Sequence, residues 1–226
     1  MTIILTNDDG IDAPGIRALL DAVKSESKII VAPQVPHSGC GHQVTTHRPI
    51  PVNKRSSEEY AVGGTPADCT RIAIHQIAPD TQWVISGINA GGNLGTDVYI
   101  SGTVAAVREA AFHGIRGVAI SHWIKKPLVI DWGIATNWTM KVLQELSDRD
   151  LPKGSFWNVN LPHLETGQPE PEIIFCQPSI DPLPVRFRVE GDLHYYEGEY
   201  SKRDRTLGTD VDVCFSGNIA VTLITL

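Results

Sequence analysis

Short apolar runs alternate with amphipathic stretches up to about residue 160 of the chain. Five runs have the length and side-chain content of buried strands: residues 3–5, 28–32, 83–85, 118–120 and 156–159. Between them lie four stretches with apolar residues at helical spacing: residues 14–23, 66–77, 102–112 and 134–146. Strands that alternate with helices favour parallel pairing, with helices on both faces of the sheet. The pattern therefore predicts an α/β fold with a Rossmann-like, mostly parallel sheet flanked by helices.

The alternation changes near Pro169. Five prolines fall between residues 169 and 184, and residues 185–189 alternate apolar with basic side chains, as in a half-exposed strand. With residues 193–200 this strand predicts a C-terminal β-hairpin arm. Residues 218–223 predict a last strand that returns to the sheet.

This change divides the chain into two expected parts. We expect a core made of residues 1–168 and 208–226, and an arm made of residues 169–207. Such an arm is a common means of contact between subunits, so a second copy of the chain is one expected partner. The alternative is a peripheral hairpin that packs on its own subunit.

Composition and charge narrow the classes of function. The 42% apolar and 20% charged fractions exclude general disorder, and no apolar run approaches the roughly 18 residues of a membrane span. No secretory signal is visible after Met1, so we expect a cytoplasmic protein without membrane contact. A net charge of −7 argues against binding to a nucleic-acid duplex.

The cysteine pattern gives no metal or disulfide framework. Cys40, Cys69, Cys176 and Cys214 are far apart and lack the spacing of zinc ligands, so we interpret them as reduced thiols. Cys69 is expected in the core, and Cys40, between glycines of a loop, at the surface.

Two adjacent carboxylates follow the first apolar run, in the segment IILTNDDGID. Neighbouring side chains of a strand point to opposite faces, so Asp8 and Asp9 can converge only after the chain has left the strand. At about 4 Å they would repel by about 4 kcal/mol at an effective dielectric constant near 20, and a bound cation removes this cost. Hard oxygen ligands suit Mg²⁺ or Mn²⁺. The alternative is a helix cap, although Asp12 is better placed to cap the helix that starts near Pro14.

Three further loops offer polar groups near the same edge of the sheet. Asn89 and several glycines follow the strand at 83–85, and the carboxyl ends of parallel strands form the usual ligand-binding edge. Ser101, Gly102 and Thr103 open a helix, where free N–H groups and hydroxyls can bind phosphate. The loop after residues 28–32 supplies Ser38, Gly39 and Gly41. Each alone is an ordinary turn or cap; together they indicate a site.

Four motifs occur in this order along the chain: ILTNDDGIDAPGI, AP followed by SG, GTPADC and SGINAGGNLGTDVYISGTVAA. Together they resemble the SurE family of stationary-phase survival proteins, which are metal-dependent nucleotidases. They cover most of residues 3–110, and the terminal segment TDVDVCFSGNIAVTLITL is similar to the family's closing segment more loosely. The chain departs from many relatives at residues 34–37, which read QVPH where they carry charged residues.

The resemblance implies hydrolysis of nucleoside 5′- and 3′-monophosphates, with one divalent metal (Mg²⁺ or Mn²⁺) per subunit. It implies the following metal ligands: Asp8, Asp9, Ser38 and Asn89. It implies the following phosphate-binding residues: Gly39, Asn93, Ser101, Gly102 and Thr103. It also implies a homodimer or homotetramer that forms through exchanged C-terminal arms. His37 and His42 could contact phosphate or base, or could be ordinary loop residues.

The expected mechanism is attack on phosphorus by a metal-activated water, with Asp8 or Asp9 as catalytic groups able to accept its proton. Three alternatives stay open. A carboxylate could attack phosphorus itself and form a phospho-aspartate. The fold could be that of haloacid-dehalogenase-like phosphatases, although their two aspartates are separated by one residue. The chain could also be a nucleotide-binding module without catalytic activity, although the Rossmann glycine fingerprint is absent after the first strand.

Overall fold

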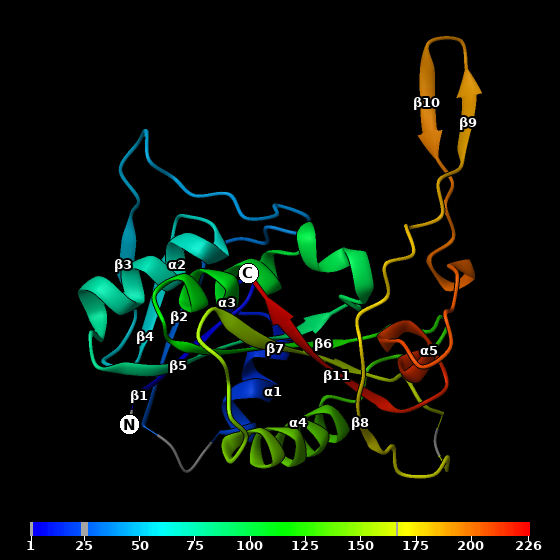
Figure 1. The fold of residues 1–226 in the computed structure, drawn as a ribbon. Helices are drawn as coiled ribbons and strands as arrows, with labels where there is room; N and C mark the ends of the chain where they lie inside the picture. Colours follow the sequence, from blue (N-terminus) through cyan, green and yellow to red (C-terminus); the bar gives the residue numbers. More distant parts are fainter. Residues whose placement is uncertain (1, 24–26, 166) are drawn as a thin grey trace.

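The computed structural model describes residues 2–23, 27–165 and 167–226 (Figure 1). Its main sheet has nine strands in the order β3-β4-β2-β1-β5-β6-β7-β11-β8. The strands are β1 (Thr2–Thr6), β2 (Ser27–Pro33), β3 (Val52–Lys54), β4 (Glu59–Val62), β5 (Thr81–Ala90), β6 (Arg116–His122), β7 (Ser155–Leu161), β8 (Ile173–Phe175) and β11 (Ile219–Thr225). All adjacent pairs are parallel except β3 with β4 and β7 with β11. The predicted α/β fold is confirmed.

Helices cover both faces of this sheet, with α1 and α4 on one side and α2 and α3 on the other (Figure 1). The helices are α1 (Pro14–Ala22), α2 (Pro66–Ile72), α3 (Gly102–Phe112), α4 (Trp132–Ser147) and α5 (Asp210–Phe215). Ile4 and Leu5 are both fully buried, each in a different apolar cluster on either side of β1. A strand buried on both faces is continuously apolar, which is why the central strands could be predicted from the sequence.

The strand order places a topological switch point at β1. From β1 the chain moves to β2 and β4 on one side, and it then crosses back to β5 on the other side. The loops after β1 and β5 therefore leave the sheet in a crevice, where ligands of open α/β sheets bind. Gly15 lets α1 approach this point, because a Cβ atom there would lie 1.9 Å from the carbonyl oxygen of Ile88.

Several local expectations were wrong. Asp12 does not cap α1, because the Asp12 carboxylate binds Arg55 instead. The N-cap of α1 is Ala13, which forms no capping bond with its side chain. Ile134, expected on the buried face of α4, is 43% exposed, because it lies in the first turn of the helix beside a surface pocket. Cys40 is half-buried rather than exposed, while Cys69 is buried as predicted. The helix predicted over residues 66–77 is present, as α2 followed by a π-helical turn, Ala73–Ile77.

The predicted hairpin is present and projects from the core (Figure 1). Its antiparallel strands, β9 (Phe187–Glu190) and β10 (Leu193–Tyr196), are exposed at every residue, whereas residues 185–189 were expected to be half-exposed. No helix among the described residues has the length and apolar character needed to cross a bilayer. The cytoplasmic location stays a prediction. So do the domain limits at 168/169 and 207/208, although β8, inside the segment assigned to the arm, pairs with β11 of the main sheet.

The stem of the arm is anchored on the turn that follows β5. Asp97, in the 3-10 turn Gly95–Tyr99, accepts hydrogen bonds at Oδ2 from the Tyr200 hydroxyl (2.5 Å) and from Arg203 Nη1 (2.8 Å). Asp210 accepts bonds from the backbone N–H groups of Gly95 (2.7 Å) and Ser179 (2.8 Å). Both sides of the arm are therefore attached to the loop that leads into α3.

We expect Asp97→Ala to lower the free energy of unfolding by about 3–5 kcal/mol, because it leaves the fully buried Arg203 side chain as an unpaired charge. Urea denaturation of the two proteins measures this difference. The control is Glu197→Ala, which removes an exposed partner of Arg188 and is expected to cost less than about 1 kcal/mol. Equal losses in the two variants would contradict the prediction.

Candidate functional site

A tight turn ends β1 and allows the two carboxylates to lie on one side of the chain. The Asn7 side chain closes it: Asn7 Nδ2 donates to the Gly10 carbonyl (2.8 Å), and the Gly10 N–H donates to Asn7 Oδ1 (3.2 Å). Gly10 has a φ of 102°, which glycine adopts readily. Asp8 and Asp9 therefore lie outside the strand, as the sequence predicted.

Asp8 packs against the first turn of α3. The Thr103 hydroxyl donates to Asp8 Oδ1 at 2.5 Å, and Asp8 is only 5% exposed. A Cβ atom on Gly102 would lie 2.8 Å from Asp8 Cβ and 2.9 Å from Cys40 Sγ, so only glycine allows this approach. Ser101 is the N-cap of α3, and its hydroxyl accepts a bond from the Val104 N–H (3.1 Å). The predicted phosphate-binding residues 101–103 thus adjoin the predicted metal ligand Asp8.

Asp9 is joined to the end of β5. Its Oδ2 accepts a hydrogen bond from the Ala90 N–H at 3.1 Å. The preceding residue, Asn89, donates from Nδ2 to the Gly91 carbonyl at 2.7 Å, which leaves its side-chain oxygen as the atom suited to a cation. β1 and β5 are direct neighbours in the sheet, and the bond to Ala90 places Asp9 beside the residue that follows Asn89. The shared role of Asp9 and Asn89 as metal ligands stays a prediction.

The loop after β2 is attached both to Asp8 and to the residue just before the N-cap of α3. The His37 N–H donates to the Asp8 carbonyl (2.7 Å), and the Gly41 N–H donates to the Ile100 carbonyl (3.0 Å). Ser38 and Gly39 lie between these two attachments and are exposed. The His37 bond places this segment near Asp8, but the Ser38 hydroxyl has no hydrogen bond to either carboxylate among the described residues, so the roles of Ser38 and Gly39 stay predictions.

Asn93 occupies a different environment from the other predicted phosphate-binding residues. It is 6% exposed, its Nδ2 donates to Ser121 Oγ (2.7 Å), and its N–H donates to Asn160 Oδ1 (2.7 Å). Its carbonyl accepts bonds from the side chains of Asn158 and Asn160. This buried network supports the glycine-rich loop, and sequence reasoning missed it. The sequence feature that could have indicated this network is the pair Asn158 and Asn160, two residues apart in a buried strand and therefore on one face of the sheet.

The two carboxylates have an unusual electrostatic environment. Burial, partly offset by the Thr103 hydroxyl and reinforced by the charge of Asp9, raises the pKa of Asp8 to about 6. Burial also raises the pKa of Asp9, against the effect of the Ala90 N–H. Within the described part of the chain, neither forms an ion pair with Lys, Arg or His. A buried and a partly buried acid next to each other, without a basic partner, fit a bound cation.

The donor set also indicates which cation would fit. No group of three or more His, Cys, Asp or Glu residues suited to a metal occurs in residues 2–23, 27–165 and 167–226. The segments around Asp8 instead offer two carboxylates with neutral hydroxyl and amide oxygens. Such a set suits a hard ion that keeps several waters, such as Mg²⁺ or Mn²⁺, better than zinc.

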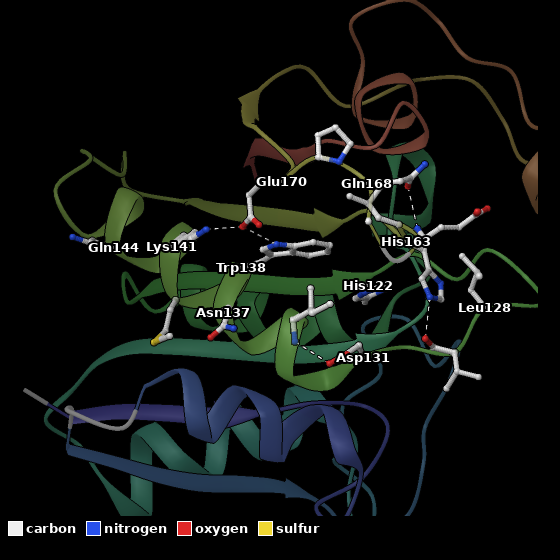
Figure 2. A pocket seen from close by; sticks show the side chains of 17 residues that line it. His122, Leu128, Asp131, Asn137, Trp138, Lys141, Gln144, His163, Gln168 and Glu170 are labelled. Atoms are coloured by element: carbon white, nitrogen blue, oxygen red, sulfur yellow. Dashed lines mark hydrogen bonds and ion pairs between the residues drawn. The ribbon is translucent and has the colours of Figure 1, made fainter.

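A pocket of about 980 Å³ lies beside α4 (Figure 2). Trp138, whose Nε1 donates to Glu170 (3.0 Å), and the rings of His122 and His163 line it. None of the predicted site residues lines this pocket. A second cleft, of about 760 Å³, is lined by Gly91 and Gly92 and therefore adjoins the candidate site.

Comparison with known proteins agrees with this geometry. Residues 3–179 match the family model described as survival protein SurE. The chain belongs to the SurE family. A Nostoc sp. protein whose name assigns it provisionally as a 5′-nucleotidase is 64% identical over 98% of both chains. The 5′-nucleotidase SurE of Paramagnetospirillum magneticum is 35% identical over 98% of this chain and 88% of its own. The crystal structure of the SurE protein from Aquifex aeolicus has a TM-score of 0.88 and 29% identity, and the match covers 100% of this chain and 93% of that one.

We expect Asp8→Asn to stabilise the metal-free protein at pH 7.5 but not at pH 4. The pKa of Asp8 in the folded state, about 6, lies above its ordinary value of 3.8. The free energy of unfolding of the wild type therefore falls by up to about 3 kcal/mol as pH rises from the lower of these pKa values to the higher. Asparagine keeps an oxygen that can accept the Thr103 bond and has no charge to desolvate. Urea denaturation in the presence of a chelator, at both pH values, measures the effect.

The control for this prediction is Asp12→Asn. Asp12 is exposed, and its hydrogen bond with Arg55 holds the pKa of Asp12 below its ordinary value, so its removal is expected to give no gain at pH 7.5. A difference between wild type and Asp8→Asn that is the same at both pH values would contradict the assignment of the charge cost to Asp8.

Proposed function

We propose that the chain is a metal-dependent phosphomonoesterase that hydrolyses nucleoside 5′- and 3′-monophosphates to nucleoside and phosphate. The observation that carries this proposal is the buried carboxylate of Asp8 against the first turn of α3, next in the chain to the partly buried carboxylate of Asp9, with no basic partner for either among the described residues. Carboxylates beside the free N–H groups of a helix N-terminus allow a cation and a phosphate group to bind next to each other. The names of the SurE relatives as 5′-nucleotidases support the substrate class.

Asp8, Asp9, Ser38 and Asn89 are the proposed ligands of one Mg²⁺ or Mn²⁺ per subunit. When bound, the ion would lower the pKa of a water molecule and neutralise charge on the transferred phosphoryl group. Each carboxylate is oriented by a protein donor, Thr103 for Asp8 and the Ala90 N–H for Asp9. Asp9 is the less buried of the two, which makes it the better candidate to accept a proton from the attacking water.

The phosphate would bind at the N-terminus of α3. N–H groups in the first turn of a helix have no partner in the helix, and the helix dipole favours negative charge there. Gly102 contributes by its lack of a side chain, and the Ser101 hydroxyl, which accepts a bond from the Val104 N–H, keeps its hydrogen to donate to phosphate. The Thr103 hydroxyl donates to Asp8, so it would lie beside the phosphate and orient that carboxylate. Gly39 would approach from the other side, and Asn93 would hold the glycine-rich loop. The cleft beside Gly91 and Gly92 has room for a nucleoside.

We further propose that the chain forms a homodimer or homotetramer through the hairpin. The hairpin carries four large apolar side chains that are each more than half exposed: Phe187, Val189, Leu193 and Tyr196. Exposure of such a group to water is unfavourable, and it is typical of a surface that binds another protein. A partner subunit would cover them. Light scattering on Phe187→Ser/Leu193→Ser tests this: we expect a smaller assembly than the wild type, and an unchanged mass would contradict the proposal.

The decisive test of activity is phosphate release from 5′-AMP and 3′-AMP with Mn²⁺, with Mg²⁺ and with a chelator. We expect release that depends on the metal, and a loss of at least about 100-fold in Asp9→Asn, because even outer-shell changes at metal sites cost 10–100-fold. The matched control is Asp12→Asn, in the same turn but bound to Arg55. A covalent phosphoenzyme trapped during turnover would favour attack by an aspartate. Nucleotide binding without any release would favour a module that is not an enzyme.

A further inference from the structure

The loop that carries Ser38 has no regular structure of its own. Residues 34–51 contain turns and bends but neither helix nor strand. Backbone groups attach it at His37 and Gly41, and also at Thr45, whose N–H donates to Asp68 Oδ1 (2.8 Å). A loop of this length loses much conformational freedom when it is ordered, so the bonds that hold it decide how well its groups are positioned.

One side chain of the loop is attached to the middle of α3. His42 Nε2 lies 2.8 Å from Glu109 Oε2, and the imidazole packs against Phe112 with a ring-centroid distance of 5.3 Å. Glu109 is only 7% exposed, although it is a carboxylate. The loop thus makes a partly buried, charge-assisted contact four residues after Ser38.

The surroundings of Glu109 show that this carboxylate is held in its ionised form. Its other oxygen, Oε1, lies 3.2 Å from His113 Nε2 and 3.6 Å from Arg71 Nε. Burial alone would raise the pKa of Glu109, but the bonds from His42 and His113 and the charge of Arg71 hold it below the ordinary value. The contact with His42 is therefore one of several that converge on a fixed anchor.

The position of this anchor connects it to the candidate site. Glu109 lies nearly two turns after Thr103 on the same helix, and Thr103 contacts Asp8. α3 therefore holds Asp8 at its first turn and the Ser38 loop at its middle. A rigid helix that fixes two of the three ligand segments sets the distance between them.

We propose that His42 and Glu109 are positioning residues, whose bond holds Ser38 at the site and thereby sets the affinity for the divalent cation. This inference rests on the proposed function, in which Ser38 is a metal ligand. Neither residue is assigned to touch metal or substrate. Outer-shell partners of this kind typically change metal affinity by 10–100-fold when removed.

The test compares two histidines that share one carboxylate. His42→Ala removes the attachment of the loop and leaves Glu109 with His113 and Arg71, so no orphaned charge results. His113→Ala removes the other imidazole and leaves the loop attached. The dissociation constant for Mn²⁺, measured by electron paramagnetic resonance, is expected to rise about 10–100-fold in His42→Ala and to stay within about twofold of the wild type in His113→Ala.

Two further readouts separate positioning from general damage. Hydrogen exchange of residues 37–43 in the metal-free protein is expected to speed up in His42→Ala only, and kcat for 5′-AMP at saturating Mn²⁺ is expected to stay near the wild-type value. His42→Gln, which can still donate to Glu109, is expected to recover much of the affinity. If His42→Ala does not fold, His42→Leu keeps the contact with Phe112 and decides the same question.

The outcomes are distinct. If His42→Ala and His113→Ala bind Mn²⁺ equally well, the positioning role is wrong while the proposed function stands. If the wild type binds neither Mn²⁺ nor Mg²⁺, the proposed function fails and the inference fails with it.

Discussion

Repulsion between Asp8 and Asp9 is the constraint on which the arrangement of the surrounding loops depends. The turn closed by Asn7 and Gly10 brings both acids to the switch point of the sheet, and burial makes their charges costly. Nothing basic among the described side chains offsets this cost. The loops that reach the carboxylates instead supply N–H groups, hydroxyls and amide oxygens. Such groups leave the negative charge in place, so it remains available to a cation.

α3 connects most of this arrangement. Its first turn and its second half contact two different loops through Thr103 and Glu109, and Ser101 caps the helix itself. The helix is buried along most of its length, and its small side chains pack closely on the sheet beneath. A helix held this firmly can keep several mobile segments in one mutual geometry, which a site built only on loops could not do.

Much of the fold and part of the site could be predicted from the sequence, because those features are local. β1, β5, β6 and β7 each contain a short run of buried, mostly apolar residues, and Ser101 is followed directly by the helix it caps. In contrast, β3, β8 and α5 have 3, 3 and 6 residues, too few for a periodic signal.

The features that could not be predicted depend on partners distant in the sequence. Asp12 binds Arg55, 43 residues away, and Asn93 binds Asn160, 67 residues away. The contact of His42 with Glu109 spans the same number of residues, 67. In each case the residue type allowed several roles, and only the packing of elements around β1 decided among them.

The arm has a separate consequence for evolution. Because Asp97 and Asp210 bind only its stem, a change in length or sequence at the exposed tip of the hairpin would leave the attachment of the stem unchanged. Such a change would alter the proposed contact between subunits without altering the proposed site at the sheet edge.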